Sequence, residues 1–114
     1  MFETKRVYEK PDESDGVRVL VDRLWPRGIK KEDAMIACWM KEIAPSDNLR
    51  KWFAHKEDRW KEFKSRYKNE LKEKSELLKQ LQDLGRDKKV TLLYAAGDEE
   101  RNNAVALLEV LKKK

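Results

Sequence analysis

Acidic, basic and aromatic side chains follow one another closely in the segment from Asp22 to Gly28, which reads Asp-Arg-Leu-Trp-Pro-Arg-Gly. The guanidinium groups of Arg23 and Arg27 can bind a carboxylate or phosphate bidentately, and each charge-assisted contact contributes roughly 1.5–3 kcal/mol. Asp22 could orient one of these arginines, act as a base, or form a structural ion pair that fixes the turn. The segment predicts a site for an anion without identifying a substrate or a reaction.

Trp25 lies between the two arginines and precedes Pro26, which favours an extended backbone at the tryptophan. Its indole could stack on a base or sugar of a ligand, as aromatic side chains do in nucleic-acid and nucleotide sites. Alternatively, it could simply cover the core. We include Trp25 among the predicted ligand-binding residues.

A second group of polar residues follows another apolar run. Val90 to Ala96 is short and nearly all apolar, as is typical of a strand buried on both faces of a parallel sheet. A helix is predicted to follow, with Asp98 as its N-cap, and Asn102 and Asn103 could offer neutral hydrogen-bond donors to a ligand. Ligands bind outside the carboxyl ends of parallel strands, so this turn and the Asp22–Gly28 turn would line one crevice if the two strands are neighbours in the sheet.

Three further side chains carry groups capable of chemistry. Tyr94 could extend its hydroxyl into the crevice or stay in the core with that hydroxyl satisfied. His55, the only histidine, is a candidate acid or base that could equally be structural or exposed, and with Asp22 and Tyr94 it completes the candidate catalytic residues. Cys38, the only cysteine, has apolar neighbours and is predicted to be a buried thiol. We therefore expect no disulfide, no metal site and no bound cofactor.

The strand that precedes the Asp22–Gly28 turn is expected to place alternate residues on opposite faces. These are Val17, Val19 and Val21 on one face, and Arg18, Leu20 and Asp22 on the other. Residues 2–8 also alternate well enough for a strand. Residues 29–44 fit both a helix and a strand, and we favour a short helix near 30–35 followed by a strand near 37–44.

Two more helices are predicted in the second half of the chain. Ser46 is expected to cap a short helix that carries Leu49, Trp52 and Phe53, with His55 at its end. From Glu57 to Leu84, apolar residues recur at steps of three, four or seven, which predicts one long helix stopped by Gly85. Strands interleaved with helices predict a single three-layer α/β domain over residues 1–114, with a small, mostly parallel sheet flanked by helices.

The composition limits the classes of function. The chain has 27 Lys and Arg against 22 Asp and Glu, a net charge of +5, and charged residues make up 43% of it. Acidic residues are interleaved with the basic ones throughout, so a nucleic-acid partner is possible but not indicated. No stretch approaches the roughly 18 apolar residues of a membrane span, and no signal peptide is recognisable. We expect a soluble, cytoplasmic protein without a membrane partner.

The sequence resembles the YeaO-like branch of the domain-of-unknown-function 488 family. The resemblance lies in three stretches: Arg18 to Lys31, Lys41 to Lys51, and Thr91 to Ala96. It implies a small α/β protein of bacterial or archaeal cytosol and implies no particular reaction. Longer members carry Cys-His-Arg at the start of the last helix, where this chain has Asn102, Asn103 and Ala104, so a thiol- or imidazole-dependent role does not carry over.

Three hypotheses follow from the sequence. The first is a protein that binds an anionic small molecule, such as a phosphate, nucleotide or carboxylate, at the carboxyl ends of its strands. The second is a nucleic-acid-binding accessory protein, and the third is a protein-interaction module that uses the long charged helix. Binding to nucleic acid would depend steeply on salt concentration.

Overall fold

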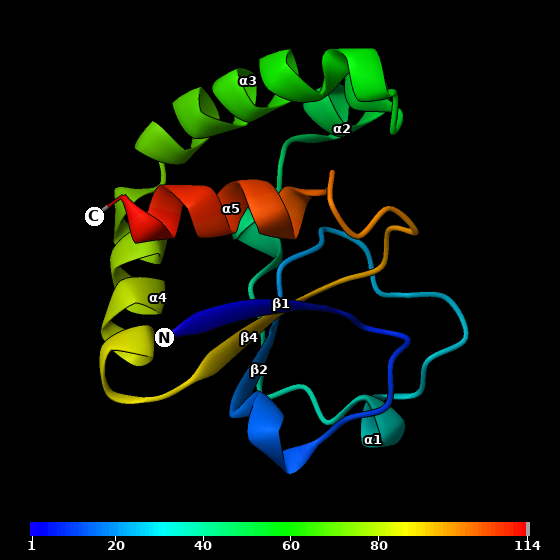
Figure 1. Ribbon diagram of the computed structural model, residues 1–114, viewed down its shortest axis with the longest axis vertical. Coiled ribbons are helices and arrows are strands. Elements are labelled where there is room, and N and C mark those ends of the chain that lie inside the picture. The colour runs from blue at the N-terminus through cyan, green and yellow to red at the C-terminus, as the bar shows by residue number, and fades with distance from the viewer. Residues whose placement is uncertain (114) are drawn as a thin grey trace.

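Four short strands form one parallel sheet at the centre of the protein (Figure 1). The computed structural model describes residues 1–113, and the strands within them are β1 (Phe2–Arg6), β2 (Val17–Leu20), β3 (Cys38–Trp39) and β4 (Val90–Tyr94). Their order in the sheet is β1-β4-β2-β3, and each neighbouring pair runs parallel. The mostly parallel sheet predicted from the sequence is confirmed.

The helices are distributed unevenly over the two faces of the sheet. They are α1 (Lys31–Ala34), α2 (Asp47–Phe53), α3 (Trp60–Lys72), α4 (Ser75–Asp87) and α5 (Asn103–Lys112). Single turns of 3-10 helix lie at Glu13–Asp15, Lys41–Ile43 and Glu57–Arg59. Helices α2 to α5 contribute to the larger hydrophobic cluster on one face, whereas the segment containing α1 covers the smaller cluster on the other. The three-layer α/β class is therefore confirmed, with one thick and one thin outer layer.

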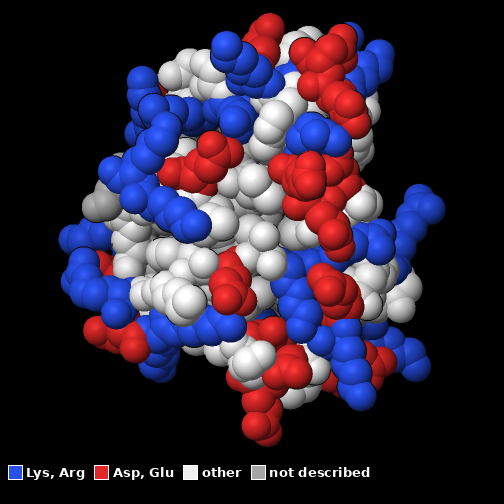
Figure 2. Space-filling model, in the orientation of Figure 1, with Lys and Arg blue, Asp and Glu red and all other residues white. Residues whose placement is uncertain are grey.

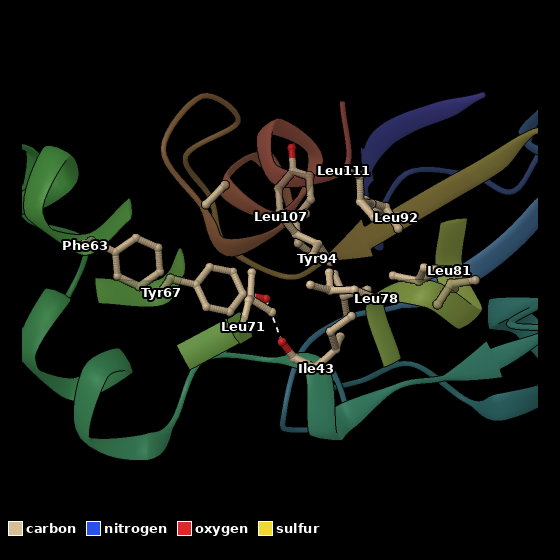
Figure 3. Packing of buried hydrophobic residues seen from close by; sticks show 14 of the residues in the cluster. Ile43, Phe63, Tyr67, Leu71, Leu78, Leu81, Leu92, Tyr94, Leu107 and Leu111 are labelled. Carbon is tan, nitrogen blue, oxygen red and sulfur yellow. Dashed lines mark hydrogen bonds between the residues drawn. The ribbon is translucent and has the colours of Figure 1, made fainter. Parts of the chain in front are cut away.

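Strand β4 is buried along its whole length because it lies between β1 and β2 and a hydrophobic cluster covers each of its faces. Figure 3 shows Leu92 and Tyr94 of β4 packed near Leu107 and Leu111 of α5, on the side of the larger cluster. The alternate β4 residue Leu93 belongs to the smaller cluster. The predicted alternation in β2 is likewise confirmed: Val19 and Val21 belong to the larger cluster and Leu20 to the smaller one.

The long helix predicted from Glu57 to Leu84 is wrong, because the chain forms α3 and α4 with a turn at Glu73 and Lys74. A straight helix over residues 57–84 would be about 42 Å long, which exceeds the 35 Å longest dimension of the protein. The turn falls in the seven-residue gap of the apolar stripe between Leu71 and Leu78. By folding back there, both helices bury their apolar stripes in the same cluster (Figure 3).

Gly85 does not end a helix as predicted, since α4 continues through it to Asp87. A Cβ atom at position 85 would lie 2.3 Å from Cζ of Phe2. The glycine therefore allows α4 to approach the first strand closely, and its lack of a side chain serves packing rather than helix termination.

The region from 29 to 44 follows the prediction in its first half only. The short helix expected near 30–35 is present as α1, but the strand expected near 37–44 shortens to β3, and Lys41–Ile43 forms a 3-10 turn. Its pairing partner β2 ends at Leu20, so β3 has no strand to pair with beyond Trp39. Cys38 lies on this edge strand and is exposed, which corrects the prediction of a buried thiol.

The N-cap predicted for the last helix is also corrected. Helix α5 is capped by Asn102, whose side-chain oxygen accepts a hydrogen bond of 2.9 Å from the backbone N–H of Val105. Asp98 lies in the preceding turn, where its carboxylate accepts from the N–H groups of Glu100 and Arg101. A second turn therefore separates β4 from α5, and both turns use a short polar side chain as acceptor.

The surface carries charges of both signs. Figure 2 shows Lys and Arg next to Asp and Glu over the face drawn there, as the interleaved charges of the sequence predict. Within residues 1–113, no helix combines the length and the apolar composition that crossing a bilayer requires.

Candidate functional site

The carboxyl ends of β2 and β4 lie side by side because these two strands are paired. After β2 the chain covers the face with the smaller cluster, whereas after β4 it leads to α5 on the opposite face. A crevice is expected where neighbouring parallel strands diverge in this way. A cavity of about 360 Å³ opens at this point, a size within the usual range for small-molecule sites.

The cavity brings together most of the site residues proposed from the sequence. Its lining includes Asp22, Arg23, Trp25, Arg27, Asn102 and Asn103. His55 also lines it, together with Arg50, which the sequence did not single out. Three arginines and one histidine therefore face a single aspartate, and the walls between them are largely apolar, with Phe53 and Phe63 among them.

Asp22 lies at the end of β2, with both carboxylate oxygens already hydrogen-bonded. Oδ2 accepts from the backbone N–H of Ala95 at 2.9 Å, and Oδ1 accepts from the side-chain amide of Asn103 at 3.0 Å. Burial raises the pKa of Asp22 above its ordinary value, although these two hydrogen bonds and the nearby positive charges of His55 and Arg50 oppose the rise. The carboxylate is thus held in a fixed orientation at the cavity wall.

Arg23 does not pair with Asp22, and among the ion pairs of residues 1–113 none involves that aspartate. Instead its Nε and Nη2 donate to the carbonyl oxygens of Pro45 and Ala44, at 3.3 and 3.2 Å. Lys74 Nζ donates to the same Ala44 oxygen at 3.0 Å. Burial lowers the pKa of Lys74, and the positive charge of Arg23 lowers it further. Arg23 therefore joins the Asp22–Gly28 turn to the loop before α2.

The turn that carries Trp25 and Arg27 is held by two hydrogen bonds. The indole Nε1 of Trp25 donates to the carbonyl of Ile29 at 2.7 Å, and the ring meets Trp39 edge-on with 5.5 Å between centroids. The hydroxyl of Tyr8 donates to the Arg27 carbonyl at 3.0 Å. The backbone of the turn is fixed in this way while the Arg27 side chain remains exposed.

Helix α2 brings Arg50 and His55 to the cavity. Its N-cap is Ser46 as predicted, since Oγ accepts from the N–H of Leu49 at 3.2 Å. Two consecutive residues with positive φ, Ala54 at 44° and His55 at 57°, end the helix. Left-handed backbone costs L-residues roughly 1–2 kcal/mol each, so packing must hold this turn. Phe53 supplies such packing by stacking on a ring of α3, with 4.4 Å between centroids.

Tyr94 is not part of the cavity lining. Its side chain alternates with that of Leu93 and points to the helix-covered face, where it is buried with Leu92 and Leu107 (Figure 3). Burial raises the pKa of its hydroxyl, and the nearby negative charge of Glu99 adds to the rise. The structure therefore separates Tyr94 from the other residues that the sequence suggested for the site.

The two asparagines differ in how much hydrogen-bonding capacity the chain uses. Asn102 lines the cavity but is buried, and it donates to the carbonyl of Asp98 at 2.9 Å while capping α5 through its oxygen. Asn103 donates to the carbonyl of Val21 and to Asp22, both at 3.0 Å. Within residues 1–113, no three His, Cys, Asp or Glu side chains are grouped so that they could hold a metal ion.

These features define a small parallel α/β protein with a cavity at the carboxyl edge of its sheet that is apolar in its walls and basic in its charged groups. The chain belongs to the family described as the inactive DUF488-N3 subclade, whose model matches residues 1–114. This family membership confirms the resemblance drawn from the sequence.

Two uncharacterized bacterial proteins illustrate the similarity. The protein Rv3073c of Mycobacterium tuberculosis H37Rv is 44% identical over 93% of this chain and 89% of its own length. The protein YeaO of Escherichia coli K12 is 43% identical over 97% of this chain and 96% of its own length. No solved structure matches the chain significantly.

Proposed function

We propose that this protein binds a small anionic molecule, a phosphate or a carboxylate, in the cavity between the ends of β2 and β4. The observation that supports this function is the convergence of Arg23, Arg27, Arg50 and His55 on a cavity whose only acidic lining residue in the described chain is Asp22. An anion placed there would meet several donors with favourable charge while its remaining surface contacts apolar walls.

The hydrogen bonds made by the arginines support this proposal. Within residues 1–113, the guanidinium of Arg27 has no protein acceptor, and Arg50 makes only an exposed contact of 3.3 Å with Asp47. By contrast, the buried Arg18 donates through Nε, Nη1 and Nη2 to acceptors of the chain itself. Arg27 and Arg50 therefore retain most of their N–H groups for a ligand, whereas Arg23 and Arg18 already donate through two and three nitrogens to the chain itself.

The proposal is for binding and includes no reaction. The description of the matching family uses the word inactive, and this chain has asparagines where longer relatives in the resemblance carry a thiol and an imidazole. The Asp22 carboxylate is also held by two donors of the chain, which suits a fixed acceptor better than a mobile base.

Titration of the isotopically labelled protein with inorganic phosphate and with benzoate, followed by amide NMR spectra, tests the proposal. We expect saturable shifts that concentrate at residues 22–28, 50–55 and 95–103. At a ligand concentration about 100 times Kd, unfolding should become more costly by roughly 2.7 kcal/mol. Added sodium chloride should weaken binding because the contacts are charged.

Two arginine variants distinguish binding in the cavity from non-specific attraction of anions to a basic protein. Arg27→Gln should weaken binding of both anions at least severalfold, whereas Arg86→Gln makes the same change in net charge on exposed α4 and should leave it unchanged. Equal affinity in the two variants, or shifts scattered over the surface, would rule out the proposed site.

A further inference from the structure

The orientation of the Asn103 amide is fixed by its two partners. Its nitrogen lies 3.0 Å from the carbonyl oxygen of Val21 and 3.0 Å from Oδ1 of Asp22, and both partners are acceptors. Only the NH₂ group can face two acceptors, so the amide cannot be reversed. Both of its protons are used, and its oxygen Oδ1 must point away from Asp22 and Val21.

The Asn103 oxygen has free capacity. No hydrogen bond to it is present in the described part of the chain, and no buried side-chain oxygen or nitrogen there lacks a partner. The oxygen is therefore at least partly exposed to solvent. The residue lines the cavity, as does its neighbour Asp22.

Asp22 also retains capacity to accept. Each carboxylate oxygen can accept about two hydrogen bonds, and each has one protein donor: Ala95 for Oδ2 and Asn103 for Oδ1. Asp22 and Asn103 can therefore accept hydrogen bonds from a ligand but have no free N–H or O–H to donate to it, and we call them the acceptor pair. The arginines of the same cavity offer donors and no acceptor.

A ligand that satisfies both the arginines and the acceptor pair must carry an anionic group and, separately, hydrogen-bond donors. An ammonium group would be a strong donor, but it would meet the positive charges of Arg23, Arg27 and Arg50 in the same cavity. Hydroxyl groups donate without carrying charge. The acceptor pair therefore selects hydroxyls, and the arginines select the anionic group.

We infer that the ligand is a polyhydroxylated anion of the sugar-phosphate class, whose hydroxyls donate to Asp22 and Asn103 while its phosphate lies among the arginines. This inference rests on the proposed function, because it assigns the basic groups and the acceptor pair of the same cavity to two parts of one ligand. It adds the acceptor pair as the group that determines specificity, and Trp25 as an apolar surface for the sugar ring.

Calorimetric titration of the wild-type protein with three phosphate monoesters tests the inference without any substitution. Methyl phosphate has the anion alone, ribose 5-phosphate adds hydroxyls, and phosphoethanolamine adds an ammonium group. We expect ribose 5-phosphate to bind about tenfold or more tightly than methyl phosphate, as two hydrogen bonds to the acceptor pair would give. Phosphoethanolamine should bind no more tightly than methyl phosphate.

The variant Asp22→Asn supplies a second test, because its affinity for the two esters should change in different directions. It should weaken ribose 5-phosphate yet leave methyl phosphate unchanged or tighter, because a negative charge near the phosphate is removed. A variant that had merely lost its fold would bind neither, and thermal unfolding identifies that case. The wild-type comparison of the three esters then decides alone.

The possible results distinguish this inference from the proposed function. Equal affinity for methyl phosphate and ribose 5-phosphate would overturn the hydroxyl selection while the anion site stands. Tightest binding of phosphoethanolamine would overturn it in favour of an amine. Absence of binding by every ester, together with inorganic phosphate and benzoate, would remove the anion site itself and the inference with it.

Discussion

Replacement of Asp15 by alanine is expected to lower the free energy of unfolding by about 3 kcal/mol. Asp15 is the buried last residue of the 3-10 turn Glu13–Asp15, and its carboxylate accepts from Lys5 Nζ at 3.0 and 3.1 Å and from Arg18 Nη1 at 2.6 Å. The backbone N–H of Asp12 adds a fourth contact at 3.0 Å. Removing the carboxylate would leave two cations close together without their shared counter-charge.

The magnitude follows from what remains around Arg18, which is only 4% exposed. Breaking one partner from a buried ion pair typically costs about 3–5 kcal/mol, since the other charge stays buried and uncompensated. The lower end applies because Nε and Nη2 of Arg18 keep their hydrogen bonds to the carbonyl of Ala34, at 3.1 and 2.9 Å. Lys5 is also partly exposed and can regain water.

Urea denaturation at pH 7 measures the effect, and Asp83→Ala is a matched control. Asp83 also pairs with an arginine three residues later, at 3.2 Å, but the two side chains are 50% and 73% exposed. Exposed pairs contribute about 0–1 kcal/mol, so the control should unfold almost as the wild type does. If Asp15→Ala lost no more stability than Asp83→Ala, the reasoning from burial would be refuted.

The pH dependence of the free energy of unfolding tests the same role of Asp15 independently. Burial raises the pKa of Asp15, but hydrogen bonds from Lys5, from the backbone of Asp12 and from Arg18 outweigh it, so the pKa lies below its ordinary value of 3.8. The folded state then binds fewer protons than the unfolded state just below pH 4. The stabilisation is complete above that pH and is lost as the pH falls through the folded pKa. The difference between wild type and Asp15→Ala should shrink accordingly in acid.

Two further predictions concern packing and titration. Gly85→Ala should destabilise the protein by about 1–3 kcal/mol in urea denaturation, because its Cβ would meet the ring of Phe2 at 2.3 Å. In a Phe2→Ala background, where that ring is absent, the same change should instead stabilise the protein by part of the roughly 1 kcal/mol helix preference of alanine. A stabilising Gly85→Ala single variant would contradict the contact. The carboxyl carbon of Asp22 should titrate by NMR with a midpoint above 3.8. Because the folded state then binds more protons than the unfolded state, the contribution of Asp22 to stability should fall as pH rises through that interval; a midpoint below 3.8 would contradict the dominance of burial.

The part of the site that follows directly from strands could be predicted from the sequence. Parallel strands end at a common edge of a sheet, so residues just after β2 and β4 meet there even when they are distant in sequence. Asp22 and Asn103, whose side chains lie 3.0 Å apart, are such a pair. Their meeting depends on β2 and β4 being neighbours, which the sequence left open, and on the turns after Tyr94 that return the chain to this edge at the start of α5.

The contribution of α2 could not be predicted in the same way. Arg50 lies in the last turn of a helix whose cap at Ser46 was recognisable, but its place beside the sheet depends on the fold-back of α3 and α4. That fold-back is set by the size of the whole core, which no local pattern of three- and four-residue steps records. The seven-residue gap after Leu71 was the one available signal.

Tyr94 shows a different limit. It ends β4 close to the cavity in sequence, yet the period of two in a strand places its ring on the face of Leu92 and away from the lining. Applying the same alternation that correctly separated Leu20 from Val21 would have placed Tyr94 with the helices. Of the two positions that the sequence allowed for Tyr94, the strand geometry supports the one in the core.

Residue type alone does not distinguish a structural arginine from one that can serve a ligand. Arg18 lies in β2 and Arg27 in the turn that follows it. The chain supplies acceptors to three nitrogens of Arg18, whereas within residues 1–113 it supplies none to the Arg27 guanidinium. The same distinction separates the oxygen of Asn103, which has no donor in the described part of the chain, from that of Asn102, which caps α5. Free hydrogen-bonding capacity at a cavity wall is what a ligand can use, and it is determined by the neighbours that the fold supplies. This is why the motif predicted the place of the cavity, while the chemistry expected of its ligand had to be inferred from the hydrogen bonds that its residues leave unmade.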